Sequence, residues 1–322
     1  MFAVYAESFD ADEPLEGLRT GERPEPVASA GWTTVDVKAA SLNHHDLWSL
    51  RGVGLAADRL PMILGCDAAG LDEDGNEVVV HAVISDPSWV GDETLDPKRS
   101  LLSERHQGTL AERVVVPRRN VVPKPVSLSF EEAACLPTSW LTAYRMLFTQ
   151  SGLRPGDSVL IQGAGGGVST ALITLAKVAG LRSYVTSRDE VKRARAVELG
   201  AHEVLEPGAR LPARVDAVME TVGAATWSHS VKSLRPGGTL VVSGTTSGAD
   251  PQSAELTRIF FLQLRVQGST MGTREELRRL VDLLDLSGAR PLIDRVLPLD
   301  RVRDGFAAMT AGDLFGKVVF TV

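Results

Sequence analysis

The sequence of 322 residues has only two cysteines, Cys66 and Cys135. Two thiols cannot build a disulfide framework, and they fall short of a zinc site made of thiolates. No segment approaches the roughly 18 unbroken apolar residues of a membrane span. The first residues also lack the basic and apolar stretches of a secretory signal peptide. These absences favour a protein of the reducing cytoplasm without a membrane partner.

Positive charge is also scarce, since 34 Lys and Arg stand against 41 Asp and Glu, for a formal net charge of -7 at pH 7. Such a chain cannot neutralise phosphates in bulk, so we expect no nucleic-acid partner. The 43% of hydrophobic and 23% of charged residues are typical of a globular protein. The length exceeds one ordinary core and suggests about two domains.

The residue pattern changes near residue 125. Before it, short β-branched runs separated by turns predict strands at 33–38, 77–84 and 112–116. From residue 130, strands (158–161, 183–186, 215–219, 239–243) alternate with helices (168–179, 190–199 and one ending at 234), with a turn at 236–238. This alternation predicts a parallel sheet with helices on both faces. After residue 268 we expect an amphipathic helix at 275–286, and a closing strand at 316–322 that suits the first domain.

A glycine-rich loop joins the first of these strands to its helix. A dinucleotide needs such a place, because backbone must approach the pyrophosphate closely at a helix N-terminus. Read from Gly163 the pattern ends in Val168, and read from Ala164 it ends in Ser169, so neither reading gives the full G-x-G-x-x-G. A flexible loop without ligand is the alternative. The predicted cofactor-binding residues are Gly163, Ala164, Gly165, Gly166, Gly167 and Val168.

The end of the second strand predicts which dinucleotide binds. An acidic residue there would hold the ribose 2′-OH of NAD, but the sequence has Ser187 and Arg188. A hydroxyl beside a guanidinium suits a 2′-phosphate, which a carboxylate would repel. NADPH is therefore favoured over NADH. Lys192 is a second candidate cation or a solvated helix residue, and Asp189 or Glu190 could instead pair with Arg188.

Ligands of open α/β sheets bind at the carboxyl ends of the strands. Backbone that follows the later strands is therefore expected to border the cofactor. The residues are Val222, Gly223, Gly244, Thr245, Thr246, Gly268, Ser269 and Thr270.

Several segments match a known family in order and spacing: 41–46 with Gly52, 65–70, 108–112, 136–138, 142–144, the glycine loop and 316–319. Together they resemble the medium-chain dehydrogenase/reductase superfamily, specifically its zinc-free quinone oxidoreductase-like branch. The resemblance implies an α/β fold, a Rossmann doubly wound parallel sheet (126–268) inserted into a GroES-like β-rich catalytic domain (1–125 and 269–322). It also implies a homodimer in which the edge strand 265–269 continues the partner's sheet.

The zinc-dependent alcohol dehydrogenases of this superfamily bind their catalytic metal through a Cys, a His and a second Cys. The corresponding positions here hold Asn43, Cys66 and Thr138. Only one of the three is a plausible zinc ligand, so the resemblance implies no catalytic zinc. Asp67 stands where the zinc enzymes have a Glu. Residues 83–107 contain no Cys, so the lobe that carries their structural zinc is missing as well.

Without a metal, hydride transfer from NADPH to a quinone or enone needs hydrogen-bond donors for the charge that develops on oxygen. The resemblance puts Asn43 and Thr138 at the substrate, and it puts His45 at the position of a proton relay. Trp48 replaces a tyrosine that is frequent in the branch, and offers an indole N–H and a flat wall. A satisfied structural polar group is the alternative for each polar member. On the cofactor side the resemblance adds His44, which would face the phosphates, with Thr142 and Lys317.

The expected function is an NADPH-dependent, zinc-independent oxidoreductase that reduces a small-molecule quinone or α,β-unsaturated carbonyl. The alternatives are an enoyl-thioester reductase, for which no clear cationic entry is visible, and a non-catalytic NADPH-binding sensor. Trp89, Phe260, Phe261 and Met271 are candidates for an apolar substrate cleft, and for Phe260 we favour core packing instead.

Overall fold

The computed structural model describes all 322 residues, which form two compact units. Unit 1 combines Met1–Leu141 with Met271–Val322, and unit 2 is Thr142–Thr270. Helix α2 (Phe130–Ala134) and the π-helical segment Leu136–Trp140 belong to unit 1, whereas the boundary expected at residue 125 assigns them to the second domain. None of the helices combines the length and apolarity needed to cross a membrane.

Unit 1 is a mostly antiparallel β structure. Its largest sheet runs in the order β10-β6-β5-β3-β18-β17, and β9 also pairs with β3. The strands of this sheet are β3 (Trp32–Ser41), β5 (Asp67–Asp72), β6 (Glu77–Val80), β9 (Arg113–Pro117), β10 (Val121–Pro123), β17 (Ile293–Pro298) and β18 (Lys317–Thr321). The smaller sheets contain β1 (Phe2–Ala6), β2 (Leu18–Glu22) and β4 (Met62–Ile63), and β7 (Val83–Ile84) with β8 (Ser100–Leu101).

The alternating residues of β3 explain why this sheet has a buried face. Thr33, Val35 and Val37 are buried, and they alternate with more exposed neighbours along the strand. The closing strand β18 pairs antiparallel with β3, so the end of the chain returns to unit 1. The run expected at 77–84 is divided into β6, which pairs with β5 and β10, and β7, which pairs with β8.

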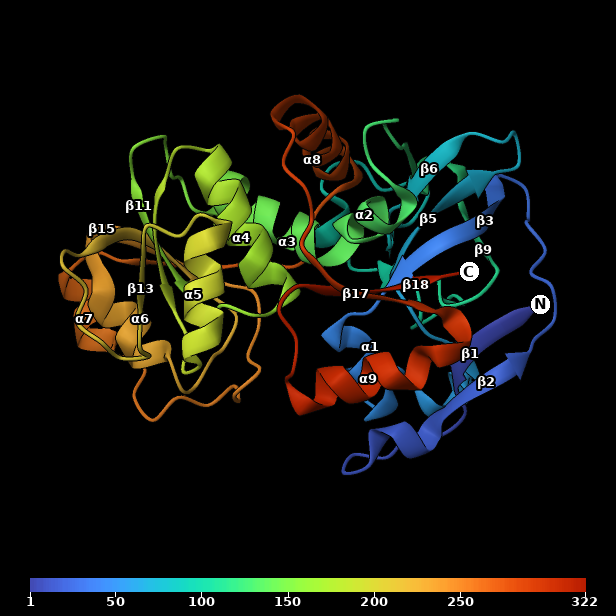
Figure 1. The fold of residues 1–322 in the computed structure, drawn as a ribbon, viewed down its shortest axis with the longest axis horizontal. Helices are drawn as coiled ribbons and strands as arrows, with labels where there is room; N and C mark the ends of the chain where they lie inside the picture. The colour runs from blue at the N-terminus through green and yellow to red at the C-terminus, as the bar shows by residue number, and fades with distance from the viewer. The chain divides into compact units, whose positions relative to one another are not determined.

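Among the helices of unit 1, α8 (Arg274–Ser287) has capping residues at both ends. Figure 1 shows α2 lying along β3 and β5. In α8, Thr273 and Glu276 form a capping box, and Gly288 ends the helix at a φ of 70°. Helix α9 (Val302–Ala311) buries Phe306 in the core. Helix α1 (His44–Leu50), which the sequence analysis did not predict, follows directly from β3 and holds the candidate catalytic segment.

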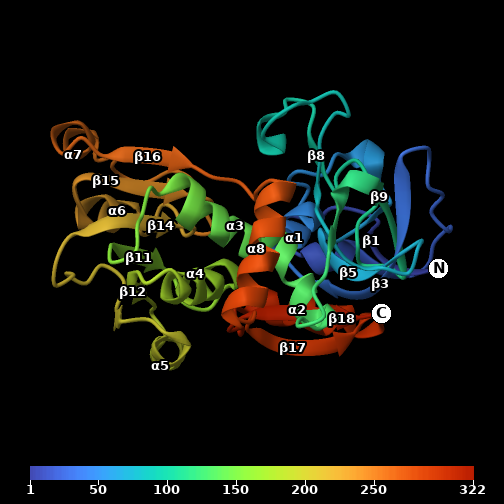
Figure 2. The same cartoon turned by 90° about the horizontal axis from the view of Figure 1, so that it is seen from above.

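Unit 2 is a parallel six-stranded sheet with the order β13-β12-β11-β14-β15-β16. This is the doubly wound order, which reverses between β11 and β14. Figure 2 shows β16 at one edge of this sheet. The strands are β11 (Ser158–Gln162), β12 (Arg182–Thr186), β13 (Glu203–Leu205), β14 (Val215–Glu220), β15 (Leu234–Val242) and β16 (Arg265–Gly268). The predicted Rossmann sheet is confirmed.

Two pairs of helices cover the sheet of unit 2. Helix α4 (Gly167–Val178) packs on α5 (Glu190–Leu199), and α6 (Trp227–Ser233) packs on α7 (Leu256–Phe261), while α3 (Leu141–Tyr144) lies at the start of the unit. The predicted turn at 236–238 is wrong as an interruption, because β15 runs through it with a shift of register against β14. The preference for core packing of Phe260 is also wrong, since 69% of this residue is exposed on α7.

Candidate active site

A buried cluster of polar side chains surrounds Asp67 in unit 1. The Asp67 carboxylate is completely buried. One of its oxygens accepts hydrogen bonds from Ser41 Oγ (2.9 Å), Asn43 Nδ2 (2.8 Å) and Lys317 Nζ (3.3 Å), and the other accepts one from Thr138 Oγ1 (2.5 Å). The cluster thus brings together three of the predicted site residues, Asn43, Thr138 and Lys317. A charge buried so deeply is tolerated because it is paired and hydrogen-bonded on both oxygens.

The strand register explains why residues so far apart in the sequence meet here. Ser41 at the end of β3 lies opposite Asp67 at the start of β5 and opposite Val319 of β18. Lys317 begins β18, so its side chain enters the cluster from the third strand. The cluster is therefore built at one end of three neighbouring strands, which contribute one side chain each, and Asn43 and Thr138 join it from the segments beside them.

The hydrogen bonds of Asn43 and Lys317 are largely used within this cluster. Asn43 Nδ2 also donates weakly to the Ser41 carbonyl (3.4 Å), and its Oδ1 accepts from Lys317 Nζ (2.7 Å). Lys317 Nζ donates in addition to the Leu42 carbonyl (2.7 Å), and only 3% of Lys317 is exposed. Lys317 has three N–H groups, so each has a partner here. In this geometry both residues hold Asp67, and contact of Asn43 with substrate or of Lys317 with cofactor stays a prediction.

His45 lies beside this cluster in an ion pair that the sequence did not indicate. Its Nε2 is 3.1 Å from Glu104 Oε1, and its Nδ1 is 3.4 Å from Ser103 Oγ and 3.5 Å from Cys66 Sγ. The side chains of His45 and Glu104 are 21% and 25% exposed, so the pair is partly shielded from water. Glu104 is therefore a candidate functional residue that sequence reasoning missed. Its only sequence signal is its place just before the matching segment at 108–112.

The charge state of His45 follows from these neighbours. Burial lowers the pKa of His45, but Cys66, Glu104 and Asp46 together outweigh it and raise that pKa well above its ordinary value. Burial also raises the pKa of the Cys66 thiol and of the Asp46 carboxyl. Because Cys66 thus remains a neutral thiol, we assign the retention of the proton on His45 mainly to the Glu104 carboxylate. The raised pKa favours the protonated imidazole of His45, which can give a proton away.

His44 and Trp48 occupy exposed positions of α1. The loss of surrounding water and the Lys317 ammonium lower the pKa of His44, so its imidazole is mainly neutral at pH 7. It can donate one hydrogen bond to a phosphate but brings no full positive charge. Trp48 is 37% exposed, and the Arg51 guanidinium lies 5.2 Å from the centre of its ring, a cation–π contact.

The donor set of unit 1 does not fit a catalytic zinc. Asn43 and Thr138 both direct their polar atoms to Asp67, while Cys66 Sγ donates to the Leu102 carbonyl at 3.3 Å. The structure brings no three His, Cys, Asp or Glu residues into an arrangement that could hold a metal ion. An amide and a hydroxyl in place of two of the three ligands are poor partners for zinc. We therefore derive no step through a metal.

In unit 2, the glycine loop between β11 and α4 forms an open cradle made of backbone. Gly163 adopts a φ of 86°, and its N–H donates to Thr186 Oγ1 (3.3 Å), which in turn donates to Gln162 (2.6 Å). Gly166 is the N-cap of α4, and a Cβ added there would meet nothing closer than Ser169 Oγ at 3.8 Å. The first N–H groups of the helix lack intrahelical acceptors, and they are suited to a pyrophosphate.

The loops that follow β14 and β15 are held together beside this cradle. Glu220, completely buried, accepts hydrogen bonds from the backbone of Val222 (2.8 Å) and Gly223 (3.0 Å) and from Thr226 and Ser230. Gly223 has a φ of 92°, and a Cβ there would lie 2.5 Å from a backbone oxygen of Gly248. Thr246 donates its backbone N–H to Thr221 (3.3 Å), which ties the predicted segment 244–246 to 221–223.

The remaining predicted cofactor residues lie as follows. Ser269, just after β16, donates its N–H to Val242 (2.9 Å), and its buried Oγ has no hydrogen-bond partner. An orphaned buried hydroxyl is unusual, and it fits a site that a polar ligand completes. Gly268 ends β16 and Thr270 is exposed, whereas Thr142 is buried in α3.

The end of β12 presents positive charge where the 2′-phosphate is expected. Arg188 is exposed and has no hydrogen bond or ion pair, while Ser187 is mostly buried. Asp189 does not pair with Arg188, because it caps α5 by accepting the backbone N–H of Lys192 (3.1 Å). Arg193, which the sequence analysis missed, donates to the carbonyl of Ser187 at 2.6 Å. Arg188 is thus available for a ligand, with a second guanidinium next to it.

Comparisons with known proteins match both units. The family model for an alcohol dehydrogenase GroES-like domain covers residues 29–126, and the model for a zinc-binding dehydrogenase covers residues 167–285. The chain is 31% identical over 297 residues to 2-methylene-furan-3-one reductase from Solanum lycopersicum. This alignment covers 88% of the chain and 70% of the relative. It is 25% identical over 325 residues to acryloyl-coenzyme A reductase from Sulfurisphaera tokodaii, with 95% and 97% covered.

A crystal structure of an NAD-dependent alcohol dehydrogenase superposes with a TM-score of 0.91 and 33% identity, over 100% of both chains. The parallel nucleotide-binding sheet and the GroES-like sheet define the class of α/β dehydrogenases and reductases. Within that class the chain belongs to the medium-chain dehydrogenase/reductase superfamily, and it is an oxidoreductase.

Proposed function

We propose that the chain is an NADPH-dependent, zinc-independent reductase of quinones or α,β-unsaturated carbonyls. The observation that carries the proposal is the His45–Glu104 pair, with His45 also 3.5 Å from Cys66 Sγ. These side chains hold a transferable proton where the zinc enzymes of the superfamily hold a metal. The relative from Solanum lycopersicum supports the substrate class, because a 2-methylene-furan-3-one is a conjugated enone.

The proposed reaction adds two electrons and two hydrogens across a conjugated system. NADPH, when bound, supplies a hydride, which carries both electrons to the β-carbon of an enone or to a quinone oxygen. The negative charge that develops on the substrate oxygen must then be met by a donor and finally by a proton. His45 supplies that proton, and Glu104 keeps it on the imidazole until it is needed. A proton from water returns His45 to its charged state.

The choice of NADPH rests on the end of β12. Arg188 is exposed and unpaired, Arg193 lies beside it and pairs with Glu206 at 3.7 Å, and Ser187 stands where a carboxylate would accept a ribose hydroxyl. A 2′-phosphate would gain charge-assisted hydrogen bonds there. The solved alcohol dehydrogenase with 33% identity is described as NAD-dependent, so a comparison of the two cofactors decides this part of the proposal.

A second candidate is the reduction of an enoyl thioester. It is favoured by the similarity along nearly the whole chain to acryloyl-coenzyme A reductase. The chemistry at the double bond would be the same, because a thioester carbonyl also stabilises the charge left by hydride addition. The two candidates differ only in what binds the far end of the substrate.

The test is a steady-state assay of the purified chain, which follows the loss of NADPH or NADH absorbance with 1,4-naphthoquinone, methyl vinyl ketone and crotonyl-coenzyme A. We expect NADPH to be oxidised faster than NADH, with turnover of the enone or the quinone. Faster turnover of crotonyl-coenzyme A would favour the second candidate. Faster oxidation of NADH would contradict the proposed preference for NADPH. Tight NADPH binding without any turnover would contradict a catalytic function and favour a sensor.

We also propose that the chain forms a homodimer through unit 2. All four residues of β16 are exposed, and the strand lies at the edge of the sheet, so one side of its backbone has no neighbouring strand. Helix α7 leaves Leu256, Phe260 and Phe261 exposed by 69%, 69% and 77%. An unpaired edge next to exposed aromatic residues is a liability unless a partner covers it. Light scattering should give a dimer for the wild type and a monomer for Phe261→Ser with Phe260→Ser, and a monomeric wild type at micromolar concentration would contradict the proposal.

A further inference from the structure

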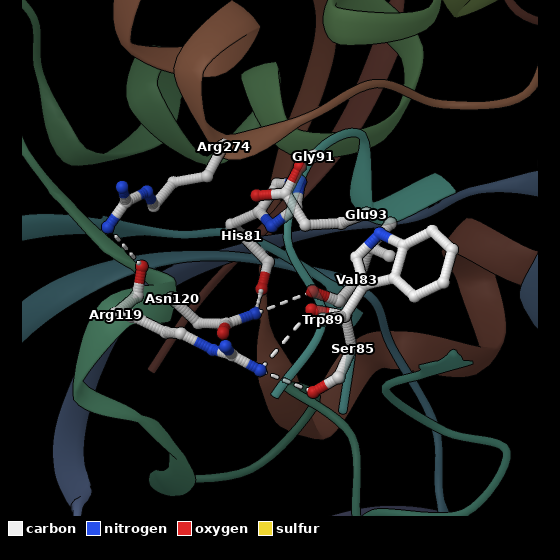
Figure 3. Close-up of a pocket in the computed structure, with 9 residues that line it drawn as sticks. All are labelled: His81, Val83, Ser85, Trp89, Gly91, Glu93, Arg119, Asn120 and Arg274. Atoms are coloured by element: carbon white, nitrogen blue, oxygen red, sulfur yellow. Dashed lines mark hydrogen bonds between the residues drawn. The ribbon is translucent and has the colours of Figure 1, made fainter. Parts of the chain in front are cut away.

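Unit 1 contains a polar cavity that shares no residue with the groups around His45 and Asp67. Its volume is about 180 Å³. A cavity of about 150 Å³ is enough to bind benzene, so this one has room for a ligand of one ring with a small substituent. Figure 3 shows the lining residues, His81, Val83, Ser85, Trp89, Gly91, Glu93, Arg119, Asn120 and Arg274.

Two guanidinium groups give the cavity hydrogen-bond donors. Arg119 Nη2 donates to the carbonyl of Ser85 and, at 3.2 Å, to its hydroxyl. Arg274, the exposed first residue of α8, donates from Nη1 to the carbonyl of Arg119 at 3.2 Å. Each guanidinium carries five N–H donors, so both keep unused ones. Arg274 thus bonds to the backbone of Arg119, and the Arg119 guanidinium bonds to Ser85.

The charges of the lining add up to one positive charge. Arg119 and Arg274 are cations, and Glu93 is the single carboxylate of the lining. Burial lowers the pKa of His81, so this imidazole is neutral, and its Nε2 is already bonded to the backbone oxygen of Gly272 at 3.0 Å. A ligand with one negative charge would therefore balance the lining.

The indole of Trp89 gives the cavity one flat apolar surface. Figure 3 shows the indole of Trp89 on the other side of His81 from Arg274. The indole Nε1 donates to the carbonyl of Asp92 at 2.9 Å, which fixes the ring, and 36% of Trp89 is exposed. Asn120 Nδ2 donates to the carbonyls of His81 (2.9 Å) and Val83 (2.7 Å) and holds the floor of the cavity in place. A planar ring can lie against such a wall.

We propose that this cavity binds a small aromatic monocarboxylate of about the size of benzoate. Its carboxylate accepts hydrogen bonds from the free N–H groups of Arg274 and Arg119, which is the strongest pairing available to a guanidinium. Its ring packs on Trp89 and Val83. The site binds its ligand whether or not the chain is a reductase, because no residue of the proposed active site takes part.

The test is calorimetric titration of the full chain with sodium benzoate, with variants matched in charge. Arg274→Gln should weaken binding about tenfold, the loss expected when a charged hydrogen bond is removed. The control is Arg278→Gln on the same helix, because Arg278 is paired with Glu275 and Asp282 and does not line the cavity. It removes the same charge and should leave the affinity unchanged. Glu93→Gln should tighten binding, since it removes a like charge.

Four results would overturn the proposal. The wild type would bind no benzoate, or Arg274→Gln and Arg278→Gln would lose equal affinity for it. Glu93→Gln would bind benzoate no more tightly than the wild type, or inorganic phosphate would bind more tightly than benzoate and displace it. Arg274 and Arg278 are both exposed, so their variants should unfold at the wild-type temperature, and a thermal scan of each checks this.

Discussion

The glycine loop of unit 2 and the Asp67 cluster of unit 1 are polar sites built in opposite ways. The loop uses backbone N–H groups, the positive φ of Gly163 and empty space above Gly166. The cluster uses side chains that are buried and bonded to one another, with Asp67 and Lys317 almost inaccessible to water. A site made of backbone should tolerate a small side chain and lose only ligand affinity. A site made of mutually dependent side chains should lose stability when a single member is removed.

The largest effect is expected from Asp67→Ala. This change leaves the Lys317 ammonium buried without its carboxylate, which costs about 3–5 kcal/mol of unfolding free energy. The matched control is Asp36→Ala, because the ion pair of Asp36 with Arg113 is about half exposed and should lose about 1 kcal/mol or less. Urea unfolding of both variants measures the difference. Equal losses would show that the cluster is not the coupled unit described above, and Asp67→Ala combined with Lys317→Met should recover part of the loss.

A second, smaller effect is expected from Gly166→Asp. Its carboxylate would stand at the start of α4 in the place proposed for the pyrophosphate, so NADPH binding should weaken by about ten- to a hundredfold. The unfolding temperature should hardly change, because the added Cβ meets no close atom. Gly166→Ala is the control, and fluorescence titration with NADPH gives both affinities. Unchanged affinity in the Asp variant would place the phosphates elsewhere.

Arg188→Ala tests the cofactor preference within the backbone-built site. Loss of one charge-assisted contact should reduce kcat/KM with NADPH about tenfold and leave the value with NADH unchanged. Arg182→Ala, at the exposed start of the same strand, removes the same charge away from the expected phosphate. If Arg188→Ala lowers kcat/KM equally with NADPH and with NADH, the guanidinium does not bind the 2′-phosphate.

The smallest expected effect is a change of pH profile in Glu104→Gln. The pKa of His45 is raised, so a proton donor at this position is charged below that pKa and is lost as the pH rises through it. Removing the carboxylate lowers the pKa of His45, and the fall in kcat should therefore begin at a lower pH. Glu73→Gln, which breaks an exposed pair with Arg118, is the control. A profile that does not move would remove Glu104 from the proton path.

The two sites also differ in how far the sequence could predict them. The loop of unit 2 is local, with a buried strand, glycines and a helix in direct succession, and α5 has the predicted bounds because Gly200 stops it. The cluster of unit 1 depends on strand register, which brings Lys317 to Asp67 across most of the chain. No local pattern marks Glu104 as the partner of His45. At 236–238 the local preference of Pro and Gly persists inside the strand, because residues 235–238 form a bulge without partners on β14 or β16 and Gly237 has a φ of 74°.

The proposal that the reaction needs no zinc can be tested most directly with methyl vinyl ketone and NADPH. Zinc is removed from the protein by chelation, its absence is shown by elemental analysis, and turnover is measured. We expect the same kcat before chelation, after chelation and after zinc is added back, because the transferred proton comes from His45. A rate that disappears on chelation and returns with stoichiometric zinc would contradict it.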